Sequence, residues 1–238
     1  MIRVLTYSAS HTVKKLGFKT STWLDRRSDN YRDDVIVRWG NTGGGEYRNV
    51  LNPARAIILN TNKVEAHDAM AKVVRVPRLF RKYTPNFGIF VVRPMTHQGG
   101  HGFKVIEANG KPINLNYQYA TEFLRTNAEY RVWFCGNRTL RAQRARTPEQ
   151  QAKGPVGRFP CRSKWGYNFC YTVPENLHIQ TIKAAKAIGL DCGAADVLLH
   201  DGYWYFLELN SAPSTDLPCL ERWFRNGITT LAQQKFGL

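Results

Sequence analysis

The chain has 238 residues, 43% of them hydrophobic and 12% aromatic, which is enough for one large or two small domains with a packed core. It contains no run of about 18 apolar residues and no apolar stretch near the start that resembles a signal peptide, so we expect a cytoplasmic protein with no membrane partner. Five cysteines without a C-x-x-C pair argue against a zinc site, and a formal net charge of +16 favours a polyanionic partner.

The first part of the chain predicts a small α/β unit. Residues 2–7, 35–39 and 56–60 are short apolar runs, and each is predicted to form a buried strand. Residues 62–71 are predicted to begin a helix, and Pro77 suits the loop that follows it. We therefore expect a truncated N-terminal α/β subdomain over residues 1–62.

The middle of the chain predicts strands at 88–94 and 103–108 around a glycine-rich loop, and a third strand at 117–124. A long hairpin is predicted from Glu129 to Arg146, with its turn at Gly136-Asn137. Residues 147–170 have no clear periodicity and are predicted to form a basic loop.

The last part of the chain predicts a helix, a hairpin and one or two terminal helical turns. Thr172 and Glu175 match a T-x-x-E capping box at the start of the helix, and Gly189 suits its end. The hairpin follows Gly189 and ends at Asn210, and the terminal helical turns are predicted over residues 220–236.

That hairpin carries two carboxylates and an amide, at Asp196, Glu208 and Asn210. Glu208 and Asn210 are two residues apart, so on a strand they point to the same face. Because a buried apolar strand does not hold ionised carboxylates without a partner, these oxygens favour a hard divalent cation, Mg²⁺ or Mn²⁺. The alternative is that they lie on the solvated face of an ordinary amphipathic strand.

The turn at His200-Asp201-Gly202 tests this metal hypothesis. A two-residue turn would pair His200 with Tyr203 and place Asp196 on the face opposite Glu208, because a slip of one residue exchanges the faces of a strand. The metal hypothesis therefore predicts an odd-length loop or an equivalent bulge, with Gly202 at positive φ.

The glycine-rich loop suits an anion. Gly99, Gly100 and Gly102 allow backbone N–H groups to approach phosphate oxygens, and Arg93 supplies a positive charge at the end of the preceding strand. The alternative is a plain glycine-rich hairpin.

Five segments, in this order along the chain, resemble the ATP-grasp superfamily. Residues 60–63 resemble its N-x-x-x-K segment, and Arg93 with the glycines resembles its lid, although the family usually has lysine at that position. Glu122-Phe123-Leu124 resembles its hinge, and Glu129-Tyr130-Arg131-Val132 resembles the D-x-R-V strand of its glutamate-ligating branch. The fifth segment, with Asp196, Glu208, Asn210 and Pro213, resembles the D…E-x-N-x-x-P metal hairpin.

The resemblance implies an α+β ATP-grasp fold, with a lid subdomain over 63–124 and a C-terminal subdomain over 125–238. It is closest to the ribosomal-protein glutamate ligases and glutathione synthases. It implies an ATP-dependent carboxylate–amine ligase that forms a C–N bond through an acyl phosphate, with ATP and Mg²⁺ or Mn²⁺ as cofactors.

The same resemblance assigns roles to individual residues. Lys63, Arg93 and the lid glycines would contact the phosphates, and Glu122, Phe123 and Leu124 would contact ribose and adenine. Arg131 and Arg144 would be the catalytic arginines, with Arg141 and Arg146 as competitors for the second. The alternatives are a solvated helix-start lysine for Lys63, an edge-strand glutamate and a core phenylalanine for Glu122 and Phe123, and a surface charge on an exposed strand for each arginine of the hairpin.

Two other functions stay open. The aromatic residues between 165 and 171 alternate with basic or polar ones, which suits a nucleic-acid-binding module on the same scaffold. A phosphotransferase that stops before ligation is the other alternative. The ligase would take a small carboxylate or amine, and its acceptor would be acidic or polyanionic, such as a nucleic acid or an acidic or ribosomal protein, approaching over the basic residues 138–164.

Overall fold

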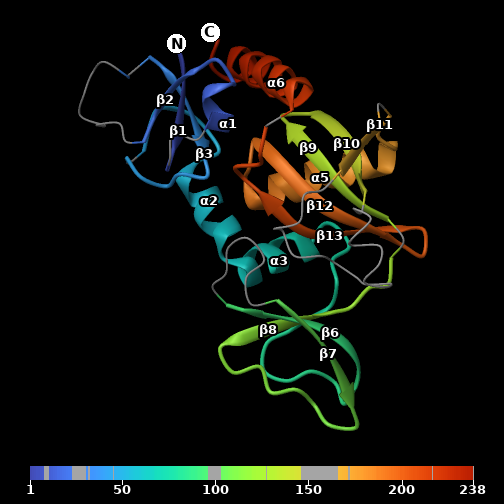
Figure 1. Cartoon of the computed structure of the whole chain (residues 1–238). Coiled ribbons are helices and arrows are strands. Elements are labelled where there is room, and N and C mark those ends of the chain that lie inside the picture. The colour runs from blue at the N-terminus through green and yellow to red at the C-terminus, as the bar shows by residue number, and fades with distance from the viewer. Residues whose placement is uncertain are drawn as a thin grey trace.

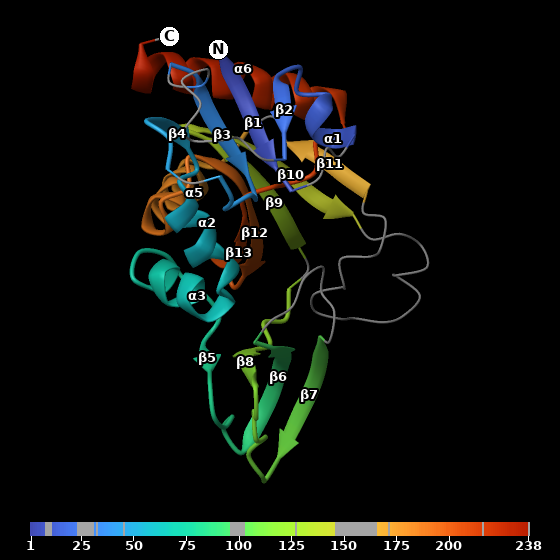
Figure 2. The same cartoon turned by 90° about the vertical axis from the view of Figure 1, so that its left-hand side faces the viewer.

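The computed structural model describes residues 1–7, 11–22, 31, 33–44, 46–95, 103–126, 128–145, 166–170, 172–215 and 217–237. Figure 1 shows three sheets arranged along the length of the molecule, with the N-terminal sheet at the top, the largest sheet in the middle and a small sheet at the bottom. Figure 2 shows both termini at the end of the molecule farthest from the small sheet.

The N-terminal sheet is parallel, in the order β2-β1-β3-β4. Its strands are β1 (Ile2–Thr6), β2 (Lys19–Ser21), β3 (Val35–Trp39) and β4 (Asn49–Leu51), with the short helix α1 (His11–Lys14) between the first two. Every residue of β3 is buried, as expected for a strand covered on both faces. The strands predicted at 2–7 and 35–39 are confirmed.

The strand predicted at 56–60 is wrong, because these residues belong to helix α2 (Ala54–Thr61). The buried residues are Ala56, Ile57 and Asn60, a helical spacing, whereas Ile58 is 60% exposed. A short apolar run does not by itself distinguish a strand from a buried helix. Helix α3 (Lys63–Ala71) follows as predicted, with Asn62 accepting a hydrogen bond from the Glu65 N–H as its N-cap.

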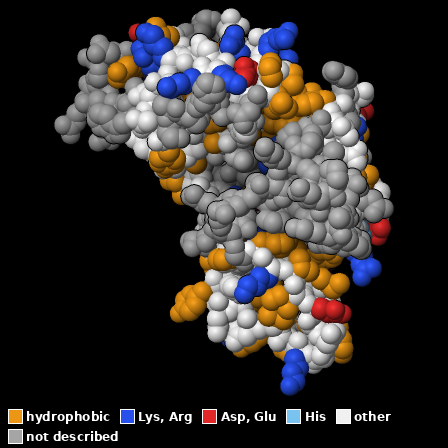
Figure 3. Space-filling view, viewed as in Figure 1, with side chains coloured by type: hydrophobic (Ala, Val, Ile, Leu, Met, Phe, Trp, Pro, Cys, Tyr) orange, Lys and Arg blue, Asp and Glu red, His pale blue; other side chains and the backbone are white. Residues whose placement is uncertain are grey.

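The small sheet at the bottom is antiparallel, in the order β5-β8-β6-β7, and we call it the lid. Its strands are β5 (Leu79–Phe80), β6 (Phe87–Pro94), β7 (Lys104–Asn109) and β8 (Gln118–Glu122). The strands predicted at 88–94 and 103–108 are confirmed, but the one predicted at 117–124 ends at Glu122. Figure 3 shows hydrophobic side chains over much of the visible lid surface.

The middle sheet is antiparallel, in the order β11-β10-β9-β12-β13, so β13 is an edge strand. Its strands are β9 (Ala128–Cys135), β10 (Arg138–Ala145), β11 (Gly166–Cys170), β12 (Cys192–His200) and β13 (Tyr203–Asn210). The hairpin predicted to turn at Gly136-Asn137 is confirmed, with Gly136 at φ 57°. Helix α5 (Glu175–Ile188) precedes β12, and helix α6 (Pro218–Phe236) ends the chain.

The two faces of the middle sheet pack against different elements. One face carries Val132 and Phe134 and packs with residues of α2, α3 and α5. The other carries Trp133, which shares a hydrophobic core with α6 and the N-terminal sheet. The N-terminal and C-terminal parts thus share a core, and the subdomain boundaries at 62 and 124 remain a prediction.

Two details of the helices complete the fold. The N-cap of α5 is Pro174, with no side-chain capping hydrogen bond, so the capping box predicted from Thr172 and Glu175 is not formed. Gly189 ends the helix in the left-handed conformation, at φ 86°, as predicted. Among the helices that the structure describes, none has the length and apolar character required to span a membrane.

Candidate nucleotide and metal site

The β12–β13 hairpin is closed by a two-residue turn. His200 pairs with Tyr203, and Asp201 and Gly202 between them have φ values of 48° and 79°. Positive φ at both central residues is the conformation that Asp-Gly favours in tight hairpins. The predicted odd-length loop is therefore not formed, while the predicted positive φ of Gly202 is confirmed.

A bulge further along the hairpin takes the place of that loop. Val197 pairs with Phe206, but the next pair is Asp196 with Glu208, so Leu207 is an extra residue on β13. One extra residue exchanges the faces of the strand beyond it. The bulge therefore brings Asp196 and Glu208 directly opposite each other on one face, as the metal hypothesis requires.

The same bulge ties the hairpin to the segment after α3. The Phe206 N–H, at the bulge, donates to the Arg75 carbonyl at 2.9 Å. The Arg75 guanidinium carbon lies 3.9 Å from the centre of the Tyr203 ring. The chain leading to the lid is thus anchored beside the carboxylates.

Asp196 is paired with Arg131 on the neighbouring strand β9. The two residues are opposite each other in the β9–β12 register, and Arg131 Nε and Nη2 donate to Asp196 Oδ1 and Oδ2 at 2.8 and 3.0 Å. The side chains are only 10% and 3% exposed. A forked pair of this kind in a buried place fixes the orientation of the carboxylate.

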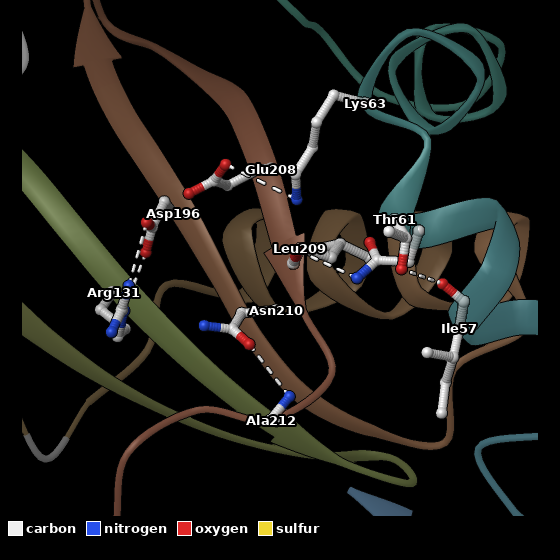
Figure 4. Close-up of polar contacts among 10 residues, drawn as sticks. Ile57, Thr61, Lys63, Arg131, Asp196, Glu208, Leu209, Asn210 and Ala212 are labelled. Atoms are coloured by element: carbon white, nitrogen blue, oxygen red, sulfur yellow. Dashed lines mark hydrogen bonds and ion pairs between the residues drawn. The ribbon is translucent and has the colours of Figure 1, made fainter. Parts of the chain in front are cut away.

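Glu208 is paired more loosely, with Lys63. Lys63 Nζ lies 3.8 Å from Glu208 Oε2, and the side chains are 22% and 23% exposed. Figure 4 shows the Lys63 side chain reaching from the start of α3 toward the strand that carries Glu208. At this distance the contact is an ion pair rather than a hydrogen bond, and a partly exposed pair of this kind contributes little free energy.

Asn210 continues the same face, because it pairs with Ala194 in the register beyond the bulge. Its Oδ1 accepts a hydrogen bond from the Ala212 N–H at 2.9 Å. Next to it, Asn60 Nδ2 donates to the Leu209 carbonyl at 3.2 Å and attaches the end of α2 to β13. Figure 4 shows the three predicted metal residues on the two neighbouring strands.

A cleft opens between α2–α3, the lid and the edge strand β13. It brings together Lys63, Arg93 and Glu208, which lie far apart in the sequence. Its described lining is Asn60, Lys63, Ala66, His67, Met70, Pro77, Arg93, Tyr119, Thr121, Leu207, Glu208 and Leu209. Two cationic side chains around the cleft suit the phosphates of a nucleoside triphosphate, and the carboxylate suits the divalent cation bound to them.

His67 is a lining residue that the sequence did not single out. It is 7% exposed, and its Nε2 lies 2.6 Å from the Pro77 carbonyl. Burial lowers the pKa of the imidazole below its usual 6.5, so the ring is neutral near pH 7. The sequence holds one signal for His67. It stands four residues after Lys63, the start of a predicted helix, and so lies on the same helix face as that lysine.

The predicted hinge residues lie elsewhere. Glu122 Oε1 accepts from the Arg78 N–H at 2.8 Å, and the Phe123 N–H donates to the Ile89 carbonyl at 3.0 Å. Neither residue, nor Leu124, is among the described residues that line the cleft. The Glu122 carboxylate therefore joins β8 to the start of β5 in this structure.

Of the arginine candidates, Arg141 lies on the face opposite Arg131. It pairs with Val132, and its guanidinium carbon lies 5.1 Å from the centre of the Tyr130 ring. Arg144 is two residues beyond Ala142, the partner of Arg131, so its register position shares the face of Arg131. Gly99, Gly100, Gly102 and Arg146 lie outside the described residues.

The oxygen donors fit a magnesium ion that is shared with a nucleotide. The described residues contain no group of three His, Cys, Asp or Glu side chains that could hold a metal alone. Mg²⁺, however, is usually held by one or two carboxylates together with substrate phosphates and water. Two opposite carboxylates, one of which lines a cleft with Lys63 and Arg93, match that requirement.

Solved ATP-grasp ligases have the same fold over nearly their whole length. PsnB, complexed with minimal precursor, Mg and ADP, has a TM-score of 0.66 at 13% identity, with 97% of each chain covered. MdnC from Microcystis aeruginosa MRC, a macrocyclase bound with precursor peptide MdnA, has a TM-score of 0.58 at 12% identity, with 98% of each chain covered. The chain therefore has the ATP-grasp fold, and the α+β prediction is confirmed.

A third structure widens the comparison within this fold. D-alanine–D-alanine ligase from Bacillus anthracis, complexed with ATP, has a TM-score of 0.60 at 9% identity. The alignment covers 99% of this chain and 96% of that one. The sequence itself matches no protein-family model and no curated protein.

Proposed function

We propose that this protein is an ATP-dependent carboxylate–amine ligase that acts through an acyl phosphate. The observation that carries the proposal is the cleft in which Lys63, Arg93 and Glu208 meet, with Asp196 opposite Glu208 on the same face of the hairpin. The lid, helix α3 and the edge strand β13 each supply one of the three cleft residues. The overall likeness to ATP-grasp ligases supports the same reading.

In the proposed reaction, a carboxylate oxygen of one substrate attacks the γ-phosphorus of ATP and ADP leaves. The amine of the second substrate then attacks the acyl carbon, and inorganic phosphate leaves as the C–N bond forms. Phosphoryl transfer depends mostly on positioning and on neutralising charge. Lys63 and Arg93 would provide that neutralisation on the α3 and lid sides of the cleft.

Glu208, Asp196 and Asn210 would hold Mg²⁺, which when bound neutralises charge on the phosphate oxygens. Arg131 would act as a positioning residue, because its Nε and Nη2 donate to the two carboxylate oxygens of Asp196 and hold them in place. Arg144 remains our candidate for the arginine that contacts the transferred phosphoryl group, on the basis of its register position.

A peptide is the acceptor class that we favour. PsnB was solved with precursor peptide PsnA2 and MdnC with precursor peptide MdnA, and this chain aligns with nearly all of each. The high positive charge fits a peptide with acidic side chains, since it would attract one over long distances. A nucleic acid satisfies the same charge argument and is the second candidate.

The direct test is mass spectrometry of candidate peptides incubated with the protein, ATP and Mg²⁺. Ligation of an amino acid predicts a mass gain equal to that amino acid less water, and an internal amide predicts the loss of one water. ADP and phosphate should appear in equal amounts with the product. A phosphorylated product would indicate a phosphotransferase, and salt-sensitive nucleic-acid binding without ADP release would indicate a binding module.

A further inference from the structure

Helix α3 presents one continuous stripe to the cleft. Lys63 is its first residue, and Ala66, His67 and Met70 follow at the three- and four-residue spacings that place side chains on one face. All four line the cleft. His67 is therefore held about one helical turn, or about 6 Å, from the lysine assigned to the phosphates.

The hydrogen bond to Pro77 determines which nitrogen of His67 carries the proton. A carbonyl oxygen only accepts, so Nε2 must be the protonated nitrogen that donates to it at 2.6 Å. In a neutral ring, Nδ1 then carries a lone pair and is an acceptor. Nδ1 is buried and has no hydrogen-bond partner among the described residues.

The charges around His67 do not supply a donor to Nδ1. Asp68, its neighbour in the chain, lies 4.0 Å from Nδ1 and is itself paired with Arg81. An unpaired acceptor in a buried place costs free energy, because it has lost its hydrogen bonds to water. A ligand that brings a donor to this position would remove that cost.

The chemistry of the position restricts which donor it takes. Phosphate and carboxylate groups carry only acceptors when ionised, so the lone pair of Nδ1 would repel them. Ala66, Met70 and Pro77 make this part of the cleft apolar. A flat ring that carries an amine fits these neighbours better than a fully hydrated ammonium group.

We propose that His67 selects an adenine base, by accepting a hydrogen bond from its exocyclic amine at Nδ1. This inference rests on the proposed function, since it places the base of ATP at the His67 end of α3. A 6-oxo purine such as hypoxanthine would present a carbonyl lone pair to the same nitrogen and would be disfavoured.

The experiment compares two nucleotides on three proteins. The nucleotides are ATP and purine riboside triphosphate, which has a hydrogen in place of the amine, both measured with Mg²⁺ by calorimetry. The proteins are the wild type, His67→Phe and His178→Phe. His178, on α5, is the matched control: it is absent from the described lining and its Nδ1 lies 2.9 Å from Thr139 Oγ1.

In the wild type and in His178→Phe, loss of the amine should weaken binding by about fivefold more than in His67→Phe, the effect of one hydrogen bond. Equal discrimination in all three proteins would overturn the role of His67 and leave the proposed function intact. No binding of either nucleotide to the wild type would instead overturn the proposed function and this inference together.

A measurement on the unmodified side chain covers the case in which His67→Phe does not fold. In protein labelled with ¹⁵N-histidine, the Nδ1 resonance of His67 should shift when ATP binds and should shift much less with purine riboside triphosphate. Equal shifts with the two nucleotides would overturn the inference.

Discussion

Asp196 and Glu208 face each other across the same hairpin, yet the structure treats them differently. Asp196 lies on a central strand, is 3% exposed and is held by two hydrogen bonds from Arg131. Glu208 lies on the edge strand, is 23% exposed and has Lys63 at 3.8 Å. One carboxylate is fixed inside the sheet, and the other is partly exposed at the sheet edge.

The strand order explains the difference. Asp196 on β12 has β9 on one side and β13 on the other, so a long side chain from β9 reaches it inside the sheet. None of the strands that the structure describes lies beyond β13, and α3 provides Lys63 across an open cleft. We therefore expect changes at Asp196 to act on stability as well as on turnover, and changes at Glu208 to act on turnover alone.

The largest expected effect is that of Glu208→Gln on ATP turnover. Loss of the exposed carboxylate should reduce turnover by about a thousandfold, or about 4 kcal/mol, because an amide cannot replace its charge beside the metal and phosphates. ADP release measures the rate, and thermal unfolding should show the fold unchanged.

The matched control is Asp201→Asn, which makes the same carboxylate-to-amide change in the same hairpin. The Asp201 side chain is 84% exposed, and Asn-Gly is as well suited to the turn as Asp-Gly. Turnover of Glu208→Gln within a few-fold of this control would exclude Glu208 as a metal ligand.

Asp196→Asn should instead destabilise the protein, by about 3 kcal/mol, because it leaves the Arg131 charge buried without its partner. The midpoint of thermal unfolding should fall by about 6–12 °C for a chain of this size. The double change Arg131→Met with Asp196→Leu should recover most of the stability but no turnover, since apolar side chains replace a buried pair well. An unchanged melting temperature in Asp196→Asn would show that the Arg131–Asp196 pair does not stabilise the fold.

Lys63→Met should have a smaller effect, mainly on nucleotide binding. The ion pair with Glu208 is partly exposed, so its loss should change the free energy of unfolding by less than about 1 kcal/mol. ATP affinity should fall by about tenfold, because the lysine charge is lost beside the phosphates. Exposed Lys72→Met, at the C-cap of the same helix, is the control and should bind ATP normally. A loss of stability without a change in ATP affinity would show that Lys63 stabilises the fold and does not bind the nucleotide.

The hairpin shows what the sequence predicts and what it does not. Asp-Gly predicted a tight turn, and the need for Asp196 and Glu208 to share a face predicted an odd-length loop or a bulge. The position of the bulge at Leu207 was not predictable, because this residue stands in a uniform run of strand-forming residues. Its place depends on the contact of Phe206 with Arg75, which is a feature of the tertiary structure.

The other differences have the same physical origin. The apolar run at 56–60 fits a strand or a helix, and only its packing against the middle sheet selects the helix. Arg131 and Asp196 were each identified from the sequence, but their mutual pairing depends on the order β9-β12 in the sheet. The hydrogen bond from the Arg78 N–H to Glu122 likewise depends on how the start of β5 lies beside β8, and the contact of Glu122 with ribose remains a prediction.

The smallest expected effect is a pH dependence of stability from His67, a buried group whose neighbour Asp68 lies 4.0 Å away and is itself paired with Arg81. Burial lowers the pKa of His67 in the folded protein below its ordinary 6.5. As the pH falls through 6.5, the unfolded chain therefore binds a proton that the folded protein still excludes, so stability decreases. The slope from this one group is at most about 1.4 kcal/mol per pH unit, and it ends below the folded pKa.

Urea unfolding of wild type and His67→Gln from about pH 7.5 to about pH 5 should show a steeper loss of stability in the wild type. Parallel curves would mean that His67 titrates alike in both states, and that its ring is not held neutral by burial.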